Sequence, residues 1–309
     1  PGLNLTPQEV NTLVEYTQSI GRALKVKGLM NVQFVILGGN HYRSPWSPGD
    51  GSQETTVYVL EVNPRASRTV PFITKLTGVP MVKLATKVML GKSLRELGYR
   101  GGLWKKQPVV GIKAPVFSMA KLIGVDTYLG PEMKSTGEVM GVDRTFQGAL
   151  AKSLIAAGLN LSPGASVLLS VADRDKAEAT TLVKDLARVG YRLYATEGTA
   201  AMIRALEVPV VAVPKRLNEG HPNVVDIILD GTVNAVVNTV TGNRATLQDG
   251  FYIRRAAVEL SLPCVTSLDT ARAIVEVLEA RARAAGGAAG DPFLEVRAVQ
   301  DYAPEVAPA

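Results

Sequence analysis

Cysteine is almost absent from this 309-residue chain, in which Cys264 alone occurs. A single cysteine excludes an internal disulfide and every cysteine-rich zinc motif. Its thiol falls in the apolar run 262–265, so we expect a buried strand residue. Histidine is equally scarce, because only His41 and His221 are present. Two histidines are too few to make a histidine-based metal cluster or a Ser-His-Asp triad a strong candidate. Hydrolytic chemistry of that type is therefore not expected.

Long hydrophobic runs are missing as well. Apolar stretches such as 208–213 and 235–237 have the length of strands and fall far short of the roughly 20 residues that span a bilayer. Residues 1–11 carry neither the basic region nor the apolar region of a secretory signal. The sequence predicts a cytoplasmic protein with no membrane partner.

Aromatic residues make up only 6% of a chain that is nevertheless basic, with a formal charge of +6. The basic residues are scattered and form no strong run, and no base-stacking pattern accompanies them. We therefore expect no nucleic-acid partner. A phosphate-bearing small molecule explains the excess of positive charge better, and most of that charge belongs to a solvated surface.

The length permits two compact domains, and the first half reads as a mixture of helices and strands. Thr6 and Pro7 are the N-cap and first residue of a helix over 7–26. Strands over 29–37 and 56–62 are expected to pair as a hairpin across a long loop. Further helices are expected over 70–77, 81–90 and 146–157, and further strands over 108–117 and 135–142.

The turn-rich segment 158–164 is the expected domain boundary, giving domains 1–158 and 159–309. Beyond it, apolar strand-like runs alternate with amphipathic helices, which predicts an α/β fold with a doubly wound parallel sheet. Ligands of such sheets bind at the carboxyl ends of the strands. The alternating segments are 166–170, 176–189, 191–195, 200–206, 210–213, 224–229, 235–238, 253–260, 263–265 and 268–284. A last edge strand is expected over 293–299.

A first candidate site lies on the expected hairpin. Glu61 and Asn63 are two residues apart and share one face of a strand, and Gln33 of the neighbouring strand adds another oxygen. Hard oxygen ligands suit Mg²⁺ bridging the phosphates of ATP, and Arg65 and Arg68 follow where they can contact phosphate. A purely structural role for a charged residue and an amide on a strand is the alternative.

The same residues carry a resemblance to a known family. The stretch E-V-N-P-R-A-S-R-T-V-P-F from Glu61 resembles the metal-binding strand and loop of the ATP-grasp domains in carbamoyl-phosphate synthetase large subunits. The similarity continues in G-L-M-N-V-Q-F from Gly28, in G-V-P-M-V-K-L-A from Gly78, and in L-G-P-E-M-K-S-T-G-E-V-M-G from Leu129. The last motif is the most specific, because other ATP-grasp enzymes such as biotin carboxylase share the E-x-N-x-R strand without it.

The resemblance, which covers nearly the whole chain, implies the C-terminal portion of such a subunit. It implies that Gln33, Glu61 and Asn63 hold Mg²⁺ or Mn²⁺ and that Arg65 contacts phosphate during the ATP-dependent phosphorylation of carbamate. The remainder of the large subunit and a glutaminase small subunit are the implied partners, in an oligomer that serves pyrimidine and arginine biosynthesis.

Two departures from the family pattern stand out. The nucleotide-grasping part of such a domain lies upstream of the first helix, whereas this chain starts at Pro1, so the chain alone is expected to be catalytically incomplete. The insertion around residues 39–54 has no counterpart in the pattern, and we assign it no role.

A second candidate site is expected to bind an anion. Thr196, Glu197, Gly198 and Thr199 stand where a strand runs into a helix, and hydroxyls, free N–H groups and the positive helix end all favour phosphate there. An ordinary helix N-cap is the alternative. The strand 236–239 ends in a similar polar cluster, and parallel strands bring such ends to one rim.

The set resembles the methylglyoxal-synthase-like domain that closes the large subunit, which implies a nucleotide monophosphate effector such as UMP or IMP. The implied pocket residues are Ser170, Lys176, Thr196, Thr199, Lys215, Asn238 and Thr239. Methylglyoxal synthase itself is the rival enzyme, but neither histidine matches the position of its catalytic histidine. A free-standing nucleotide sensor is the alternative that needs no catalysis.

A third set concerns ornithine. Glu138, Asp249 and Thr266 resemble positions that bind ornithine in some relatives, at the junction with the catalytic half. Asp249 is equally placed to cap the helix that follows it.

Overall fold

The computed structural model describes residues 5–37, 55–121, 127–129, 132–159, 164–215, 220–240, 244–285 and 297–302. The chain divides into two compact units, residues 1–109 with 297–309, and residues 110–296. None of the helices in the described part of the chain combines the length and the apolar character that crossing a bilayer requires.

In the first unit, helix α1 (Pro7–Ala23) begins as its sequence predicts. The Thr6 hydroxyl accepts the Glu9 N–H while the Glu9 carboxylate accepts the Thr6 N–H, a capping box that satisfies two of the orphan donors. Strands β1 (Asn31–Leu37) and β2 (Thr56–Asn63) pair antiparallel, with Gln33 opposite Glu61. The predicted hairpin is confirmed, and a bulge lies between Gln33 and Phe34.

Helices α2 (Thr69–Thr77) and α3 (Met81–Met89) complete the regular part of this unit. Gly78 separates them with a φ of 73°, a left-handed conformation that glycine adopts without a steric penalty. The expected edge strand over 293–299 falls largely outside the described residues, and the short 3₁₀ helix η5 (Val299–Asp301) begins at its end. The insertion around 39–54 also lies outside them.

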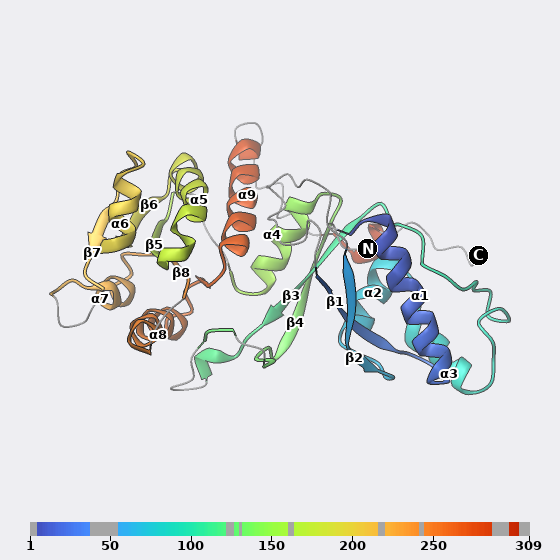
Figure 1. The fold of residues 1–309 in the computed structure, drawn as a ribbon. Helices are drawn as coiled ribbons and strands as arrows, with labels where there is room; N and C mark the ends of the chain where they lie inside the picture. Colours follow the sequence, from blue (N-terminus) through green and yellow to red (C-terminus); the bar gives the residue numbers. More distant parts are fainter. Residues whose placement is uncertain are drawn as a thin grey trace. The chain divides into compact units, whose positions relative to one another are not determined.

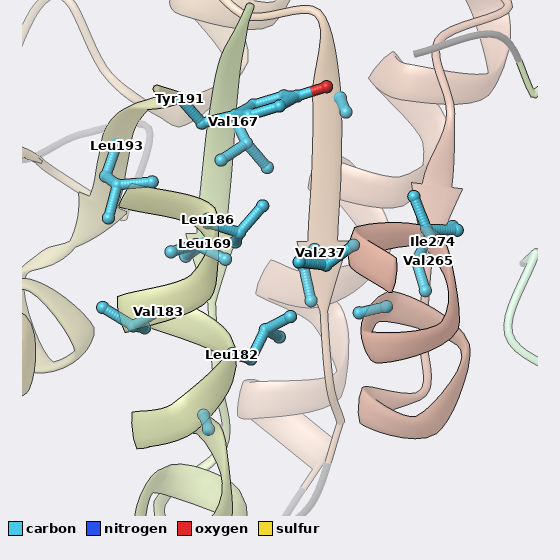
Figure 2. Packing of buried hydrophobic residues seen from close by; sticks show 14 of the residues in the cluster. Val167, Leu169, Leu182, Val183, Leu186, Tyr191, Leu193, Val237, Val265 and Ile274 are labelled. Atoms are coloured by element: carbon cyan, nitrogen blue, oxygen red, sulfur yellow. The ribbon is translucent and has the colours of Figure 1, made fainter. Parts of the chain in front are cut away.

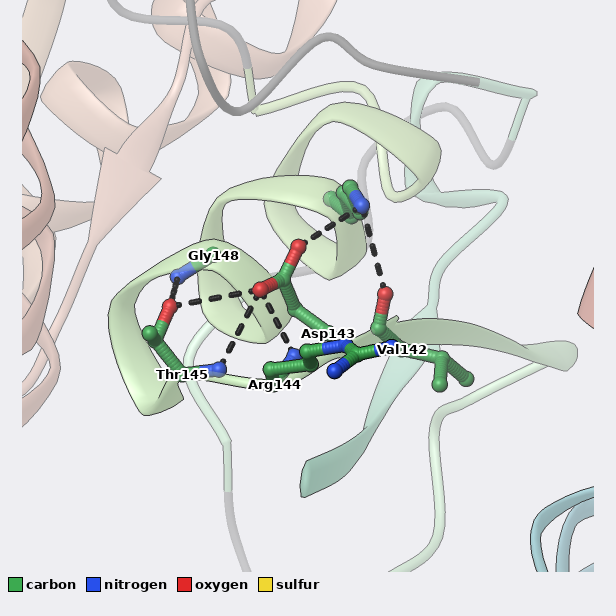
Figure 3. Close-up of polar contacts among 6 residues, drawn as sticks. Val142, Asp143, Arg144, Thr145 and Gly148 are labelled. Carbon is green, nitrogen blue, oxygen red and sulfur yellow. Dashed lines mark hydrogen bonds and ion pairs between the residues drawn. The ribbon is translucent and has the colours of Figure 1, made fainter. Parts of the chain in front are cut away.

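The second unit opens with an antiparallel hairpin, β3 (Val110–Val116) and β4 (Gly137–Asp143), which packs against helix α4 (Phe146–Ala156). The Thr145 hydroxyl caps α4 by accepting the Gly148 N–H. Figure 3 shows the Asp143 carboxylate at this helix end, where one oxygen accepts the N–H groups of Arg144 and Thr145. The other oxygen pairs with the Lys152 ammonium at 2.8 Å. The predicted elements are confirmed here to within a few residues.

The rest of this unit alternates strands and helices, as predicted (Figure 1). Among the described residues, five strands form a parallel sheet in the order β7-β6-β5-β8-β9. The strands are β5 (Ser166–Ser170), β6 (Arg192–Thr196), β7 (Val211–Val213), β8 (Ala235–Asn238) and β9 (Cys264–Val265). The helices are α5 (Lys176–Arg188), α6 (Glu197–Arg204), α7 (Val224–Leu229), α8 (Arg244–Glu259) and α9 (Leu268–Ala285), with the 3₁₀ helices η2 (Met119–Lys121) before β4 and η3 (Asp173–Asp175) before α5.

Hydrophobic cores cover both faces of the sheet, which confirms the doubly wound class. Alternate residues point to opposite faces, so Val167 and Leu169 join the core with α5, α6 and α9, while Leu168 joins the core with α7 and α8. Figure 2 shows the first core, where Leu182 and Leu186 of α5 face the strands. Burial in this core raises the pKa of the Tyr191 phenol to about 12.

Two expectations need adjustment. Cys264 does lie in a strand, but it is half-buried rather than buried. The compact unit that holds the parallel sheet begins at residue 110, because α4 packs against α9 and adds Ala151 and Leu154 to the same core. The boundary near residue 158 stays a prediction about the sequence domains.

Candidate functional site

A cavity of about 380 Å³ opens at the carboxyl edge of the parallel sheet. The chain leaves β5 towards β6 on one side and later returns to form β8 on the other, so the strand order reverses between β5 and β8. The loops after these two strands diverge to opposite faces of the sheet, which leaves a crevice above their ends. The cavity lies at this switch point.

All seven residues predicted for the effector pocket line this cavity. They are Ser170, Lys176, Thr196, Thr199, Lys215, Asn238 and Thr239. Asp249 lines it too, together with Asp173, Glu197 and Gly250. The prediction missed Asp173, although it follows the end of β5 by three residues and sits three before Lys176.

The two threonines of β6 and α6 are joined in one network. The Thr199 hydroxyl accepts the Val171 N–H at 3.0 Å and is bonded by the Thr196 hydroxyl at 3.2 Å. Thr196 occupies the N-cap of α6 but makes no side-chain cap hydrogen bond. The ordinary N-cap role is therefore not realised, and the first-turn N–H groups of α6 face the cavity edge without a hydroxyl cap.

The end of β8 is tied to β5 in a similar way. The Thr239 hydroxyl accepts the Ala172 N–H at 2.9 Å, and the Asn238 Nδ2 donates to the Ser170 carbonyl at 3.3 Å. On its other side the Asn238 Oδ1 accepts a hydrogen bond from Arg254 at 2.8 Å. These side chains are held in place by backbone partners, so the cavity wall is preorganised.

Both lysines at the cavity are held by aspartates. Lys176 Nζ lies 2.6 Å from the Asp173 carboxylate, and Lys215 Nζ lies 3.9 Å from the Asp249 carboxylate. The hydrogen bond and charge of Lys176, with a smaller contribution from Lys215, lower the pKa of Asp173. Asp173 is 93% exposed, so solvent screens its hold on Lys176. An incoming anion can displace this carboxylate and take over the ammonium.

A helix N-terminus, hydroxyls, an amide and two ammonium groups converge on one cavity, a combination that suits a phosphate group. His221, the histidine in the described residues, does not line the cavity, and its Nδ1 lies 2.6 Å from Asp226 Oδ2 beside α7. The cavity therefore offers groups that bind an anion, and in the described part of the chain no histidine lines it beside the carboxylates.

The residues predicted to hold a metal ion also come together. Glu61 Oε1 accepts hydrogen bonds from Gln33 Nε2 and from Asn63 Nδ2, both at 2.8 Å. Arg65 Nη2 donates to Asn63 Oδ1 at 3.3 Å, which places the guanidinium at the same spot. The pairing of β1 with β2 sets Gln33 opposite Glu61, and the period of the strand puts Asn63 on the same face.

This donor set fits Mg²⁺ or Mn²⁺. Rotation of each side-chain amide by a half turn would present its oxygen beside the Glu61 carboxylate, giving three hard oxygen donors. The bound ion would supply charge neutralisation for a transferring phosphoryl group. Among the described residues, no group of three or more histidine, cysteine, aspartate or glutamate side chains offers another metal site.

The three residues predicted for ornithine do not all line the cavity. Asp249 lines the cavity, whereas neither Glu138 nor Thr266 does. Glu138 lies on β4 and pairs with Lys113 Nζ at 3.1 Å, and Thr266 directly follows β9. The capping alternative for Asp249 is wrong, because α8 already begins at Arg244.

Two families of known proteins match different parts of this chain. Residues 1–97 match the family described as carbamoyl-phosphate synthase L chain, ATP binding domain. Residues 178–266 match the MGS-like domain family. The first match contains the Glu61 set, and the second contains most of the cavity lining.

Individual relatives agree with the family matches. The carbamoyl phosphate synthase large chain of Thermomicrobium roseum is 55% identical over 278 residues, which cover 90% of this chain and 24% of that protein. The protein of the same name from Thermoanaerobacter sp. is 46% identical over 278 residues, with the same coverage. This chain therefore spans about a quarter of the length of these relatives. The solved structure of ForH matches 38% of this chain and 79% of its own, with 20% identity and a TM-score of 0.29, a likeness that carries no argument.

Proposed function

Because this chain belongs to the carbamoyl phosphate synthase large-chain family and contains its ATP-binding and MGS-like domains, we propose that its parallel-sheet domain binds a nucleotide monophosphate effector. UMP and IMP are the candidate effectors. One observation carries this proposal: the seven side chains chosen from the sequence all line one cavity at the switch point of the sheet. A free-standing sensor would need the same cavity, but the match of residues 1–97 favours a regulatory domain attached to a catalytic one.

We propose for the other unit a part in the phosphorylation of carbamate by ATP. Gln33, Glu61 and Asn63 would hold Mg²⁺ or Mn²⁺, and Arg65 would contact phosphate. The convergence of these side chains on Glu61 Oε1 supports this assignment. The whole activity would require the rest of the large subunit and a glutaminase small subunit, in a cytoplasmic oligomer that serves pyrimidine and arginine biosynthesis.

Ornithine binding is a separate and narrower proposal. Asp249 is its best supported residue, because its carboxylate faces the cavity and lies 3.9 Å from the Lys215 ammonium. Glu138 and Thr266 would contribute from β4 and from the end of β9. Competition between ornithine and nucleotide for this chain, measured by calorimetry, would test whether the two ligands share Asp249.

The effector proposal is tested by calorimetric titration of the chain with UMP and IMP. We expect saturable binding of at least one of them. Lys176→Met should weaken that binding roughly tenfold or more, because it removes a charge-assisted hydrogen bond to the phosphate. Lys184→Met is the matched control, since Lys184 is exposed on the same helix and does not line the cavity.

Thr196→Ala is the second variant. It should weaken binding while the circular dichroism spectrum and melting temperature stay close to those of the unsubstituted chain. If the folded Lys176→Met and Thr196→Ala variants bind the nucleotide as tightly as the unsubstituted chain, the site is contradicted. A loss of affinity in Lys184→Met as large as that in Lys176→Met would also contradict it.

A further inference from the structure

Arg254 is a fully buried arginine behind the cavity wall. Its exposed fraction is 0%, yet it is not among the residues that line the cavity. Burial of a guanidinium is costly unless its donors are satisfied, so such a residue is retained for a specific contact. One of its contacts is the Asn238 side chain, at the carboxyl end of β8.

This contact and the Ser170 carbonyl together fix which way the Asn238 amide points. Arginine has donors only, so the amide atom that faces it must be the oxygen. The opposite atom, Nδ2, then faces the Ser170 carbonyl on the cavity side. Nδ2 carries two N–H groups, of which the Ser170 carbonyl accepts one, and the second can be offered to an anion. A reversed amide would present a carbonyl oxygen to the phosphate and repel it.

Glycine at position 250 makes room for this contact. A Cβ atom added at Gly250 would lie 2.6 Å from Arg254 Nη1 and 3.3 Å from Asn238 Oδ1. Such a distance forces a shift, and the guanidinium is enclosed on all sides. Gly250 itself lines the cavity, one turn of α8 before Arg254. Helix α8 thus places Gly250, which has no side chain, and the buried Arg254 guanidinium beside Asn238 at the end of β8.

We propose that Arg254 is a positioning residue of the effector cavity, which fixes the Asn238 amide as a hydrogen-bond donor to the bound phosphate. The inference rests on the proposed nucleotide site and deepens it. The Arg254 guanidinium also stacks over the Tyr128 ring, with its Cζ 5.8 Å from the ring centroid. Arg254 therefore contacts both the Asn238 amide at the cavity and Tyr128 in the segment between β3 and β4.

Titration with inorganic phosphate, with UMP and with IMP tests this inference. Arg254→Met should lower the affinity about tenfold, because one donor to the anion is no longer held in place. Arg255→Met is the matched control, since Arg255 is also buried on α8 but donates to the Met119 carbonyl instead of Asn238. Its affinity should stay within about twofold of the unsubstituted chain.

A double-mutant cycle separates positioning from general support of the fold. If Arg254 acts through Asn238, then Arg254→Met should have little further effect in a chain that already carries Asn238→Ala. Arg254→Lys keeps the positive charge and an N–H donor group, so it should recover part of the affinity. Gly250→Ala keeps both side chains, but its added Cβ would crowd the Arg254 guanidinium and the Asn238 oxygen. It should therefore also lower the affinity, and it serves if Arg254→Met does not fold.

The outcomes are distinguishable. If the unsubstituted chain binds and the Arg254 and Gly250 variants bind equally well, the role of Arg254 is overturned and the effector site stands. Additive losses in the Asn238 cycle would also overturn it. If the unsubstituted chain binds none of phosphate, UMP and IMP, the proposed effector site fails, and the inference fails with it.

Discussion

Ser170, Thr196 and Asn238 are each the last residue of a parallel strand, and each is at least 94% buried. A small polar side chain at such a position can serve the fold and the site together, as Asn238 does by donating to the Ser170 carbonyl of the neighbouring strand end. The position is readable from sequence because a polar residue directly after an apolar run marks a strand end. Buried Arg254 gave no such signal, since its contact to Asn238 spans 16 residues and a charged residue on a helix usually faces solvent.

Glu61 is the residue on which the metal assignment depends. Glu61→Gln keeps the shape and both amide neighbours but removes the negative charge that a divalent ion needs. Placed in the complete enzyme, this change should lower carbamoyl phosphate formation by roughly a hundredfold or more, with little effect on folding because the site is exposed.

The control is Glu15→Gln on the exposed face of α1, which should leave the rate unchanged. Carbamoyl phosphate formation and thermal melting are measured on both variants. A Glu61→Gln enzyme that retains its rate at saturating Mg²⁺ would remove the metal assignment.

At the scale of elements, β4 and α4 touch through a glycine. A Cβ atom at Gly141 would lie 2.0 Å from the Ala149 carbonyl oxygen and 2.5 Å from the Ser153 nitrogen, both backbone atoms of α4. Gly141→Ala should therefore lower the free energy of unfolding by about 1–3 kcal/mol or more, because the helix must move away from the hairpin. Urea denaturation measures this change.

Gly137 supplies the matched control on the same strand. A Cβ atom there would meet only Val116 Cβ at 3.9 Å, an ordinary contact. Gly137→Ala should change the stability by less than about 0.5 kcal/mol. Equal destabilisation by the two substitutions would mean that the loss comes from strand conformation rather than from contact with α4.

Asp143 makes the start of α4 sensitive to acid. Burial raises its pKa, but the hydrogen bond and charge of Lys152 and the N–H groups of Thr145 and Arg144 together hold the pKa below its usual value. The group therefore stabilises the folded state above the unfolded-state pKa of about 3.9, and this contribution is lost as the pH falls through the lower folded-state pKa.

Asp143→Asn tests that linkage. At pH 7 it should lower the free energy of unfolding by about 1–3 kcal/mol, because the pair with Lys152 is only 19–20% exposed. The difference from the unsubstituted chain should shrink as the pH falls below about 4. A difference that stays constant down to about pH 2 would show that charge is not its origin.

The elements show where sequence reasoning succeeds and where it stops. Periodicity located most helices and strands to within a few residues, because apolar spacing dictates which face is buried. Helix α8 was predicted near residue 253 but begins at Arg244, since residues 241–249 are mostly polar and give no apolar period. Contacts such as Asn238 with Arg254 depend on how α8 packs on the sheet, which local pattern does not contain.

At the scale of the molecule, the two units carry the two proposed tasks separately. The Glu61 set lies in the unit built on residues 1–109, and the cavity lies wholly in residues 110–296. The effector site is therefore testable in this chain by itself, although the chain spans about a quarter of its relatives (24%). A coupling between effector and catalysis would need the effector to favour one arrangement of the units over another.

The most direct test of the cavity assignment is amide ¹H–¹⁵N spectroscopy of the chain during separate titrations with UMP and with IMP. With at least one nucleotide, we predict saturable shifts of the Val171, Ala172, Gly198 and Thr199 amides, which border the cavity, and no shift at Asn63 or Arg65. Saturable shifts confined to residues outside the cavity, or no shifts with either nucleotide, would contradict the assignment.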